Sequence, residues 1–440
     1  MRSPDTPSGG ALRHGRRPGI MQDIVSMVST RRNLAEPGKA SKPSVAQASS
    51  PRTLAAAFIA AVLSVMPAFL LGGVAVLVRA DLGFSESRLG LCVTAYYVAS
   101  MVAAVPGGHL AERLGGLRAC TVGIVLSAGA LLSVAALAHG WWQLVACLAV
   151  GGMANALLQP ATNLALARRI PTHRQGLAFG FKLANGPAAT LLAGLSASLI
   201  ATTVGWRWAF VAMACLAMAF LAVRPPDWRA ETPYVPKASD GPNAALPTLV
   251  LMAAGSAFAV AAASSLVSFY VESAVAAGLT VAIAGWLQVA GSTMGTVARP
   301  AWGWLVDHRR TSGFGLIGLL LTVGGVAFAL LGANAGSALL LVATVLAFIA
   351  GWGWPGLLLF AVVRASPATP GKATGIVIVG TSTGGVVGPT AFGFLVENAG
   401  YAVAWRAAAL ALLLGAICVG GGARLLRRRI TATRAFALTP

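Results

Sequence analysis

Acidic residues are scarce in this sequence, which has only 12 Asp and Glu among 440 residues, against 32 Lys and Arg. Charged residues make up 10% of the chain, where an ordinary soluble domain has about 25%. Three of the longest uncharged stretches are 53–78, 119–167 and 311–363. A helix of about 20 apolar residues is long enough to cross a bilayer. The shortage of charge therefore excludes a disordered chain, argues against a soluble enzyme and indicates a membrane protein with several spans.

Groups that carry enzyme or metal chemistry are also few. The acids and the five histidines all lie in tails, in loops or near the ends of apolar stretches, and Glu272 lies closest to a span. The sequence has no phosphate-binding loop and no His-Glu-x-x-His motif, so we expect neither an enzyme nor a cofactor or metal site. The cysteines lie inside apolar stretches without disulfide or metal-ligand spacing, and we expect buried structural thiols. They are Cys92, Cys120, Cys147, Cys215 and Cys418.

The apolar stretches divide into twelve expected transmembrane helices. The two longest are each interrupted by turn-forming or interfacial residues, at 138–142 and 332–336. We therefore expect an all-α membrane protein of two six-helix halves. The expected spans are 54–78, 88–108, 118–138, 142–166, 176–203, 207–223, 246–270, 280–304, 313–332, 336–362, 373–396 and 405–424.

The regions outside the spans complete the expected organisation. The apolar patch at 24–28 is too short for a signal peptide. The expected parts are a disordered basic tail (1–52), a first half (53–223), a Pro-rich linker (224–245), a second half (246–424) and a tail (425–440).

Basic residues are distributed unequally between the two sides of the membrane. With both termini on the same side, 27 Lys and Arg fall on that side, and four fall opposite, namely Arg79, Arg88, Arg207 and Arg406. The positive-inside rule then places both termini in the cytoplasm and the protein in the cell membrane. The net charge of +20 lies in short loops and tails and not in a basic domain with interleaved aromatic residues, so nucleic acid is not an expected partner.

The two halves repeat each other. The segment from Gly108 to Glu112 recurs 195 residues later as Gly303 to Asp307. The pair Trp206-Arg207 recurs 199 residues later. Equivalent elements separated by six spans indicate parallel halves related by an axis along the membrane normal.

The loop after the second expected span resembles the signature of the major facilitator superfamily, Gly-x-Leu-x-Asp-Arg-x-Gly followed by two bases. Glu112 stands where the family usually has Asp, and the basic pair is missing. The matching positions are Gly108, Leu110, Arg113 and Gly115. The resemblance covers about 54–424 and implies a secondary transporter that works by alternating access on a small-molecule substrate. We expect it to act as a monomer in the lipid bilayer.

The signature residues are candidates for a conformational latch. Gly108 lets two helix ends approach closely, and an acid there can face the positive N-terminus of a neighbouring helix. The alternative is plain topogenic and surface charge. The candidate latch consists of Gly108, Glu112, Arg113, Gly303 and Asp307.

Polar and aromatic side chains inside the spans are candidate substrate contacts, since substrates of such transporters bind near the midplane between the halves. The fourth span carries Asn155, Gln159 and Asn163 on one helix face, and the eighth carries Gln288. Tyr270 and Trp354 are aromatic candidates, and Trp354-Pro355 predicts a kink. The alternative for each is interhelical bonding or plain packing.

Lys182 is the one charged residue that we expect within a span and away from its edge. No acid of the same half lies at matching depth, so a substrate anion is the natural counter-charge. Asn185 follows three residues later on the same helix face and is a further candidate contact. The alternative is that the lysine stem snorkels back to the headgroups.

The sequence therefore favours a secondary transporter of a small organic solute, with an anion as the best candidate. The alternatives are an efflux transporter for amphipathic drugs and a membrane sensor that does not transport. Drug/proton export is disfavoured because no acid or histidine is expected inside a span.

Overall fold

The computed structural model describes residues 50–170, 178, 180–223, 244–309, 311–333, 336–367 and 369–437. The described residues are almost entirely helical and contain no strand. They belong to one compact unit, Ser49–Pro440. Nearly all of the expected tail 1–52 and linker 224–245 lies outside the described residues, so the expected domain boundaries stay predictions.

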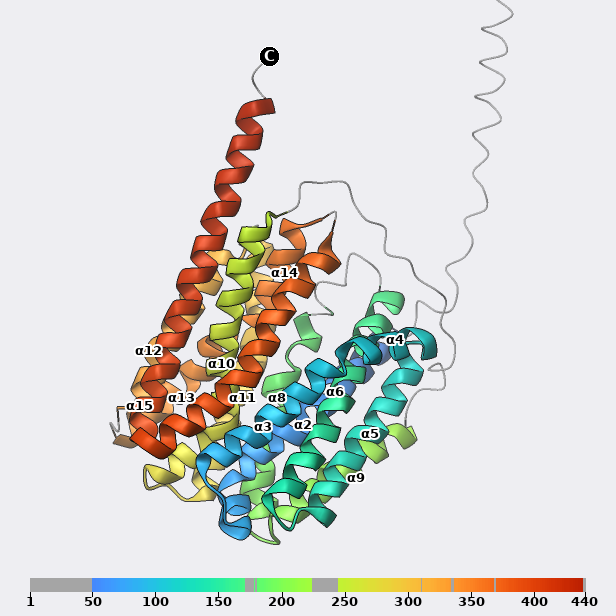
Figure 1. Ribbon diagram of the computed structural model, residues 1–440, viewed down its shortest axis with the longest axis vertical. Coiled ribbons are helices and arrows are strands. Elements are labelled where there is room, and N and C mark those ends of the chain that lie inside the picture. Colours follow the sequence, from blue (N-terminus) through green and yellow to red (C-terminus); the bar gives the residue numbers. More distant parts are fainter. Residues whose placement is uncertain are drawn as a thin grey trace, which may run out of the picture. The chain divides into compact units, whose positions relative to one another are not determined.

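Two sets of helices make up this unit (Figure 1). We call them the first and the second half. The first half contains α2 (Ser50–Leu82), α3 (Glu86–Val102), α4 (Ala104–Leu114), α5 (Gly116–Leu137), α6 (Trp141–Arg169), α8 (Asn185–Ser196), the π-helical turn η2 (Ala197–Ala201) and α9 (Trp206–Val223). The second half contains α10 (Leu246–Ala276), α11 (Val281–Arg309), α12 (Phe314–Leu331), α13 (Gly336–Leu346), η4 (Ala347–Gly351), α14 (Pro355–Ala365) and α15 (Pro370–Ala437).

The helices are long and apolar enough for a multi-pass membrane protein. Among the described residues, ten helices could cross a bilayer, and eleven if α3 and α4, bent by 54°, form one span. The long helix α15 changes direction at Gly400, where φ is 81°, and counting its two arms separately would add one more. The exact number of twelve spans stays a prediction. Helix α15 also continues to Ala437, beyond the expected end of the last span at 424.

One glycine of the signature, Gly115, forms the turn between two helices. Gly115 separates α4 from α5 with a φ of 79°, a backbone conformation that favours glycine. The second half lacks a glycine at the equivalent spacing. Its turn instead uses Gly313, also with a φ of 79°, just before α12.

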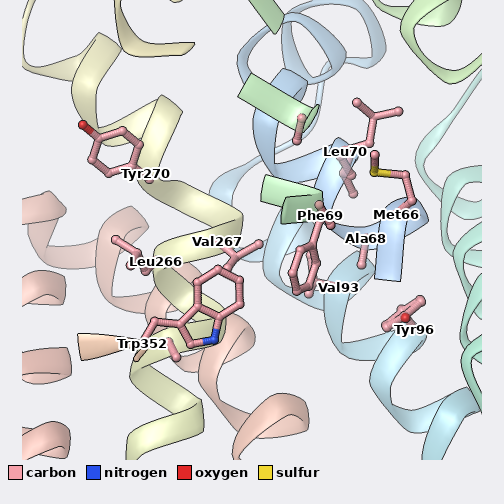
Figure 2. Close-up of a cluster of buried hydrophobic side chains, with 14 of the residues drawn as sticks. Met66, Ala68, Phe69, Leu70, Val93, Tyr96, Leu266, Val267, Tyr270 and Trp352 are labelled. Atoms are coloured by element: carbon pink, nitrogen blue, oxygen red, sulfur yellow. The ribbon is translucent and has the colours of Figure 1, made fainter. Parts of the chain in front are cut away.

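The two halves pack through small residues on facing helices. Helix α2 packs on α10, α3 on α15 and α8 on α11. A Cβ atom on Gly72 would clash with the carbonyl of Val267, and one on Gly90 would clash with that of Pro389. Close backbone approach of this kind is how helices associate where the hydrophobic effect is absent. Figure 2 shows Trp352 of the second half beside Val267 and near Phe69 of α2, and the ring centres of Trp352 and Phe69 lie 5.7 Å apart.

The cysteines only partly match the expectation. Cys92, Cys120 and Cys147 are buried, but Cys215 is exposed and Cys418 is half-buried. The expectation of five buried thiols was wrong at Cys215 and Cys418, because an apolar helix in a membrane can turn a side chain outward at no cost. None of the five forms a disulfide.

Candidate functional site

Lys182 lies at the centre of a polar cluster inside the first half. Its amine donates to Oε1 of Gln159 at 2.5 Å and to Oδ1 of Asn163 at 3.0 Å. The two amide residues stand four apart on α6, so they share one face of that helix. Lys182 is only 2% exposed, whereas Asn163 is exposed. The side chain is therefore held inside the bundle, and the snorkelling alternative does not describe it.

Hydrogen bonds continue from this lysine toward the middle of α6. Nε2 of Gln159 donates to Oδ1 of Asn155 at 3.3 Å and to Oγ of Ser64 at 3.2 Å. Nδ2 of Asn155 then donates to Oγ of Ser100 at 2.8 Å. The structure thus joins three of the candidate residues, Lys182, Gln159 and Asn155, into one polar chain.

Asn185 does not join this chain. It is the first residue of α8, it is buried, and its Nδ2 donates to the carbonyl of Ala61 at 3.0 Å. Its expected place beside Lys182 was wrong, because the backbone turns at 183–184 and removes the helical spacing between the two residues.

The charge of Lys182 has no carboxylate partner among the described residues. The ion pairs described there involve only Arg79, Arg207 and His109 as bases. Amide oxygens supply dipoles but no charge. The buried ammonium is thus solvated and not neutralised.

Arg299 is a second buried cation, and it was missed. The sequence count treats it as a loop base, but α11 extends to Arg309 and leaves Arg299 only 9% exposed. Its guanidinium donates to the carbonyl of Leu183 in the first half and to that of Trp352 at 2.7 Å. Its Cζ lies 5.0 Å from the centre of the Trp352 ring. The statement that Lys182 is the one charged residue inside a span was therefore wrong.

Proline explains why the carbonyl of Leu183 is available to Arg299. A proline within a helix has no N–H for the carbonyl four residues before it. Pro187 therefore leaves the Leu183 carbonyl without its helical partner, and Arg299 donates to it. The same rule applies at Pro355, since Nε1 of Trp354 donates to the carbonyl of Gly351 at 3.1 Å. Trp354 is buried, and its bond satisfies the carbonyl that the helix break leaves without a backbone donor.

The other candidates of the second half make interhelical bonds. Nε2 of Gln288 donates across the halves to the carbonyl of Thr190 at 2.9 Å. The hydroxyl of Tyr270 lies 2.6 Å from Oγ1 of Thr344. Both side chains are almost completely buried. Oε1 of Gln288 and Oγ of Ser292 are buried without a partner, so this region retains hydrogen-bonding capacity.

One end of the bundle, which we call the Arg79 end, carries an ion pair that joins the two halves. Arg79 of α2 contacts Glu272 of α10 at 2.7 Å and Glu86 of α3 at 2.8 Å. The hydroxyl of Tyr401 donates to Glu272 at 3.4 Å. A pocket of about 350 Å³ lies beside these four residues.

The opposite end carries the expected latch, and we call it the Glu112 end. Glu112 is 73% exposed, with His109 4.0 Å away, and Arg113 is exposed. A Cβ atom on Gly108 or on Gly303 would meet nothing within 4 Å. The side chain of Asp307 lies outside the described residues. The ion pair that the structure records for Glu112 is with His109 of the same helix, so the latch stays a prediction.

Comparison with known proteins identifies the family. The model of the Major Facilitator Superfamily matches residues 57–272 and 249–436. A chloramphenicol resistance protein of Streptomyces lividans is 30% identical over 349 residues, which are 76% of this chain and 87% of that protein. The Probable anion transporter 3, chloroplastic, of Arabidopsis thaliana is 29% identical over 151 residues, 34% of this chain and 30% of that protein.

Two further likenesses agree. The quinolone resistance protein NorA of Staphylococcus aureus is 29% identical over 123 residues, 28% of this chain and 29% of that protein. The crystal structure of a bacterial homologue of the human lysosomal transporter Spinster, in an inward-facing and occupied conformation, has a TM-score of 0.61 at 16% identity. The match covers 87% of this chain and 96% of that one. The chain therefore belongs to the major facilitator superfamily, and it is a multi-pass membrane transporter and not an enzyme.

Proposed function

We propose that this protein is a secondary active transporter of a small organic anion, and that Lys182 recognises the negative charge. The observation that carries the proposal is the ammonium of Lys182, buried among Gln159 and Asn163 with no carboxylate partner among the described residues. A lysine at mid-bilayer costs about 2.5–3.5 kcal/mol on insertion scales, so such residues usually have a functional partner. A bound carboxylate or phosphate would supply the missing charge.

Arg299 supports an anion in the same region. It belongs to the second half, yet it donates to the carbonyl of Leu183, the residue that follows Lys182. Its Nε is buried without a hydrogen-bond partner. Two cations from opposite halves thus flank one helix break, where an anion that contacts both would favour closure of the halves around it.

Orientation is part of the proposal. Moving Arg299 from the loops to the interior leaves 26 of the 27 bases on the side of the termini, against four opposite. We therefore place both termini and the Glu112 end in the cytoplasm of a cell membrane. Reporter fusions at Ala138 and Gly205 should report outside, and a fusion at Ser239 should report inside. An outside signal at Ser239 would contradict this topology.

Drug export is the second candidate, because the relative with 30% identity is named for chloramphenicol resistance. Named relatives of both kinds match the chain, since another is named as an anion transporter. The two candidates differ in what Lys182 does. An uncharged drug can only accept a hydrogen bond from the buried ammonium, whereas an organic anion also compensates its charge.

Transport by purified protein in liposomes tests the proposal. We would measure uptake of radiolabelled mono- and dicarboxylates and of chloramphenicol by the wild type, Lys182→Gln and the control Lys372→Gln, an exposed lysine at the start of α15. We expect carboxylate uptake in the wild type and the control and its loss in Lys182→Gln. Chloramphenicol transport that is unaffected by Lys182→Gln, without carboxylate uptake, would favour drug export. Binding without any uptake would indicate a sensor.

A further inference from the structure

We propose that Glu272 is a proton-binding site, and that its protonation releases the halves at the Arg79 end. The sequence places this acid at the outer limit of a span that ends at 270, but α10 continues to Ala276 and buries it. Glu272 is 4% exposed and is the one buried carboxylate among the described residues. The inference does not depend on the chemistry of the transported solute.

The charges around Glu272 do not balance. Arg79 on α2 forms ion pairs with two carboxylates, Glu272 at 2.7 Å and Glu86 at 2.8 Å. The exposed carboxylate of Glu397 on α15 also interacts electrostatically with Arg79, so negative charge is in excess around this arginine. Tyr401 on α15 adds a hydroxyl and no charge. The chain from 273 to 298, which leads into α11, contains no charged residue, and neither does η4. A proton on Glu272 would reduce this excess of negative charge.

The arrangement of the bonds makes protonation act on the contact between the halves. Arg79 is held within the first half by Glu86 and by the carbonyl of Phe84, to which its Nε donates at 3.0 Å. Among the ion pairs of the described residues, its contact with Glu272 is the one that crosses to the second half. When a proton from water binds Glu272, Arg79 keeps its partners in the first half and the crossing ion pair becomes a weaker neutral hydrogen bond. The halves can then separate at this end.

The surroundings favour a proton over a metal ion. The pocket of about 350 Å³ beside Arg79, Glu86, Glu272 and Tyr401 gives water access to the carboxylate. A bound cation such as Na⁺ needs several oxygen ligands, and Arg79 occupies one oxygen of Glu272 and one of Glu86. Among the described residues no group of three His, Cys, Asp or Glu side chains could hold a metal ion.

Distance measurements between spin labels test this proposal without any substrate. The labels would replace Val204 of the first half and Ala399 of the second, both exposed and near the Arg79 end, in a chain whose five cysteines are changed to alanine. The protein would be in lipid nanodiscs at pH 8 and at pH 5. In the wild type we expect a short distance at pH 8 and a growing long-distance population at lower pH, by up to tenfold per pH unit for one proton.

Three variants give the result its meaning. Glu272→Gln should show the long distance at both pH values, and Glu272→Asp should keep a pH response. Glu397 is the matched control because its exposed carboxylate also crosses the halves, accepting from the backbone N–H of Ser87 at 3.3 Å, which a glutamine can also do. Glu397→Gln should behave like the wild type.

Several outcomes would overturn the proposal. They are a wild type whose distances do not change with pH, a response that survives in Glu272→Gln, a response that Glu397→Gln abolishes, and a change driven by NaCl and not by KCl at constant pH. Each of these leaves the anion proposal untouched, since no solute is present. Loss of anion uptake by Lys182→Gln likewise does not affect the distances.

Discussion

The Arg79 end and the Glu112 end of the bundle use similar residues in opposite states. At the Arg79 end, Arg79 is bonded to Glu272 across the halves, and Gly90 packs tightly against Pro389. At the Glu112 end, Glu112 is largely exposed and Gly108 faces open space. Among the described residues, an acid, a base and a close-packing glycine therefore contact the other half at the Arg79 end, whereas the contacts recorded for Glu112 and Gly108 do not cross the halves.

The difference identifies which contacts depend on conformation. Alternating access requires that one end opens as the other closes. A contact that exists at only one end at a time stabilises one conformation by its full free energy, so even 1.4 kcal/mol changes the ratio of the two states tenfold. The following predictions test the difference between the two ends, beginning with the largest effect.

Gly90→Ala should have the largest effect. Its Cβ would clash with the Pro389 carbonyl, which is backbone and cannot rotate away. We expect a cost of about 3 kcal/mol to the conformation that is closed at the Arg79 end. The accessibility of a cysteine at Ser87 to a membrane-impermeant thiol reagent would measure the opening. The matched control is Gly108→Ala, which should not increase labelling at Ser87. Equal labelling in both variants would mean that the two ends do not differ.

Arg299→Gln should destabilise the region between the ends. It removes donors from the carbonyls of Leu183 and Trp352, which leaves two carbonyls without partners. Burying the arginine itself costs free energy, which partly offsets these hydrogen bonds. We therefore expect the variant to lose about 2 kcal/mol in the free energy of unfolding. Thermal unfolding in detergent would show it. Arg309→Gln, at the exposed end of the same helix, should unfold like the wild type, and equal stability of the two variants would refute the role of Arg299.

Glu112→Gln should leave the present conformation unchanged. Among the described residues, the ion pair recorded for its carboxylate is with His109, at 4.0 Å. If Glu112 holds the Glu112 end closed in the other conformation, the variant should destabilise that closed conformation by about 1.5 kcal/mol. Accessibility at the Glu112 end would rise accordingly, by about tenfold in population. Unchanged accessibility and unchanged transport would remove support for the latch.

Asp81→Asn should have the smallest effect, although its ion pair is as short as the one that involves Glu272. Asp81 contacts Arg207 at 2.7 Å, but both residues lie in the first half and both are partly exposed. We expect about 0.5 kcal/mol in stability and no change in the balance of conformations. A change in the labelling of a cysteine at Ser87 in this variant would show that an ion pair within one half also controls the balance of conformations.

The sequence predicted features that depend on local rules. Hydropathy predicted the apolar helices, and Pro355 predicted the break that Trp354 stabilises. The spacing of Gln159 and Asn163 predicted their shared helix face, although not its contact with Lys182. The break at 183–184 follows from Pro187 by the same rule and could have been found. Recognising that break would also have shown that Asn185 cannot share a helix face with Lys182.

Contacts between the halves could not be predicted. The pairing of Arg79 with Glu272 joins residues 193 positions apart, and nothing local marks them as neighbours. Arg299 was missed because it lies five residues from the expected end of its span, where a charge is ordinarily assigned to the headgroups. The extra turns of α11 decide its burial.

The most direct test of the account is whether Lys182 recognises charge. The affinity of the purified transporter for a carboxylate found to be transported should be compared with its affinity for the corresponding primary amide, in the wild type, Lys182→Gln and Lys182→Arg. A charge-assisted bond is worth about 1.5–3 kcal/mol, so the wild type should prefer the carboxylate by about 10- to 100-fold. Lys182→Gln should lose this preference, and Lys182→Arg should retain most of it. A wild type that binds the acid and the amide equally, or a Lys182→Gln variant that keeps the preference, would contradict the central claim.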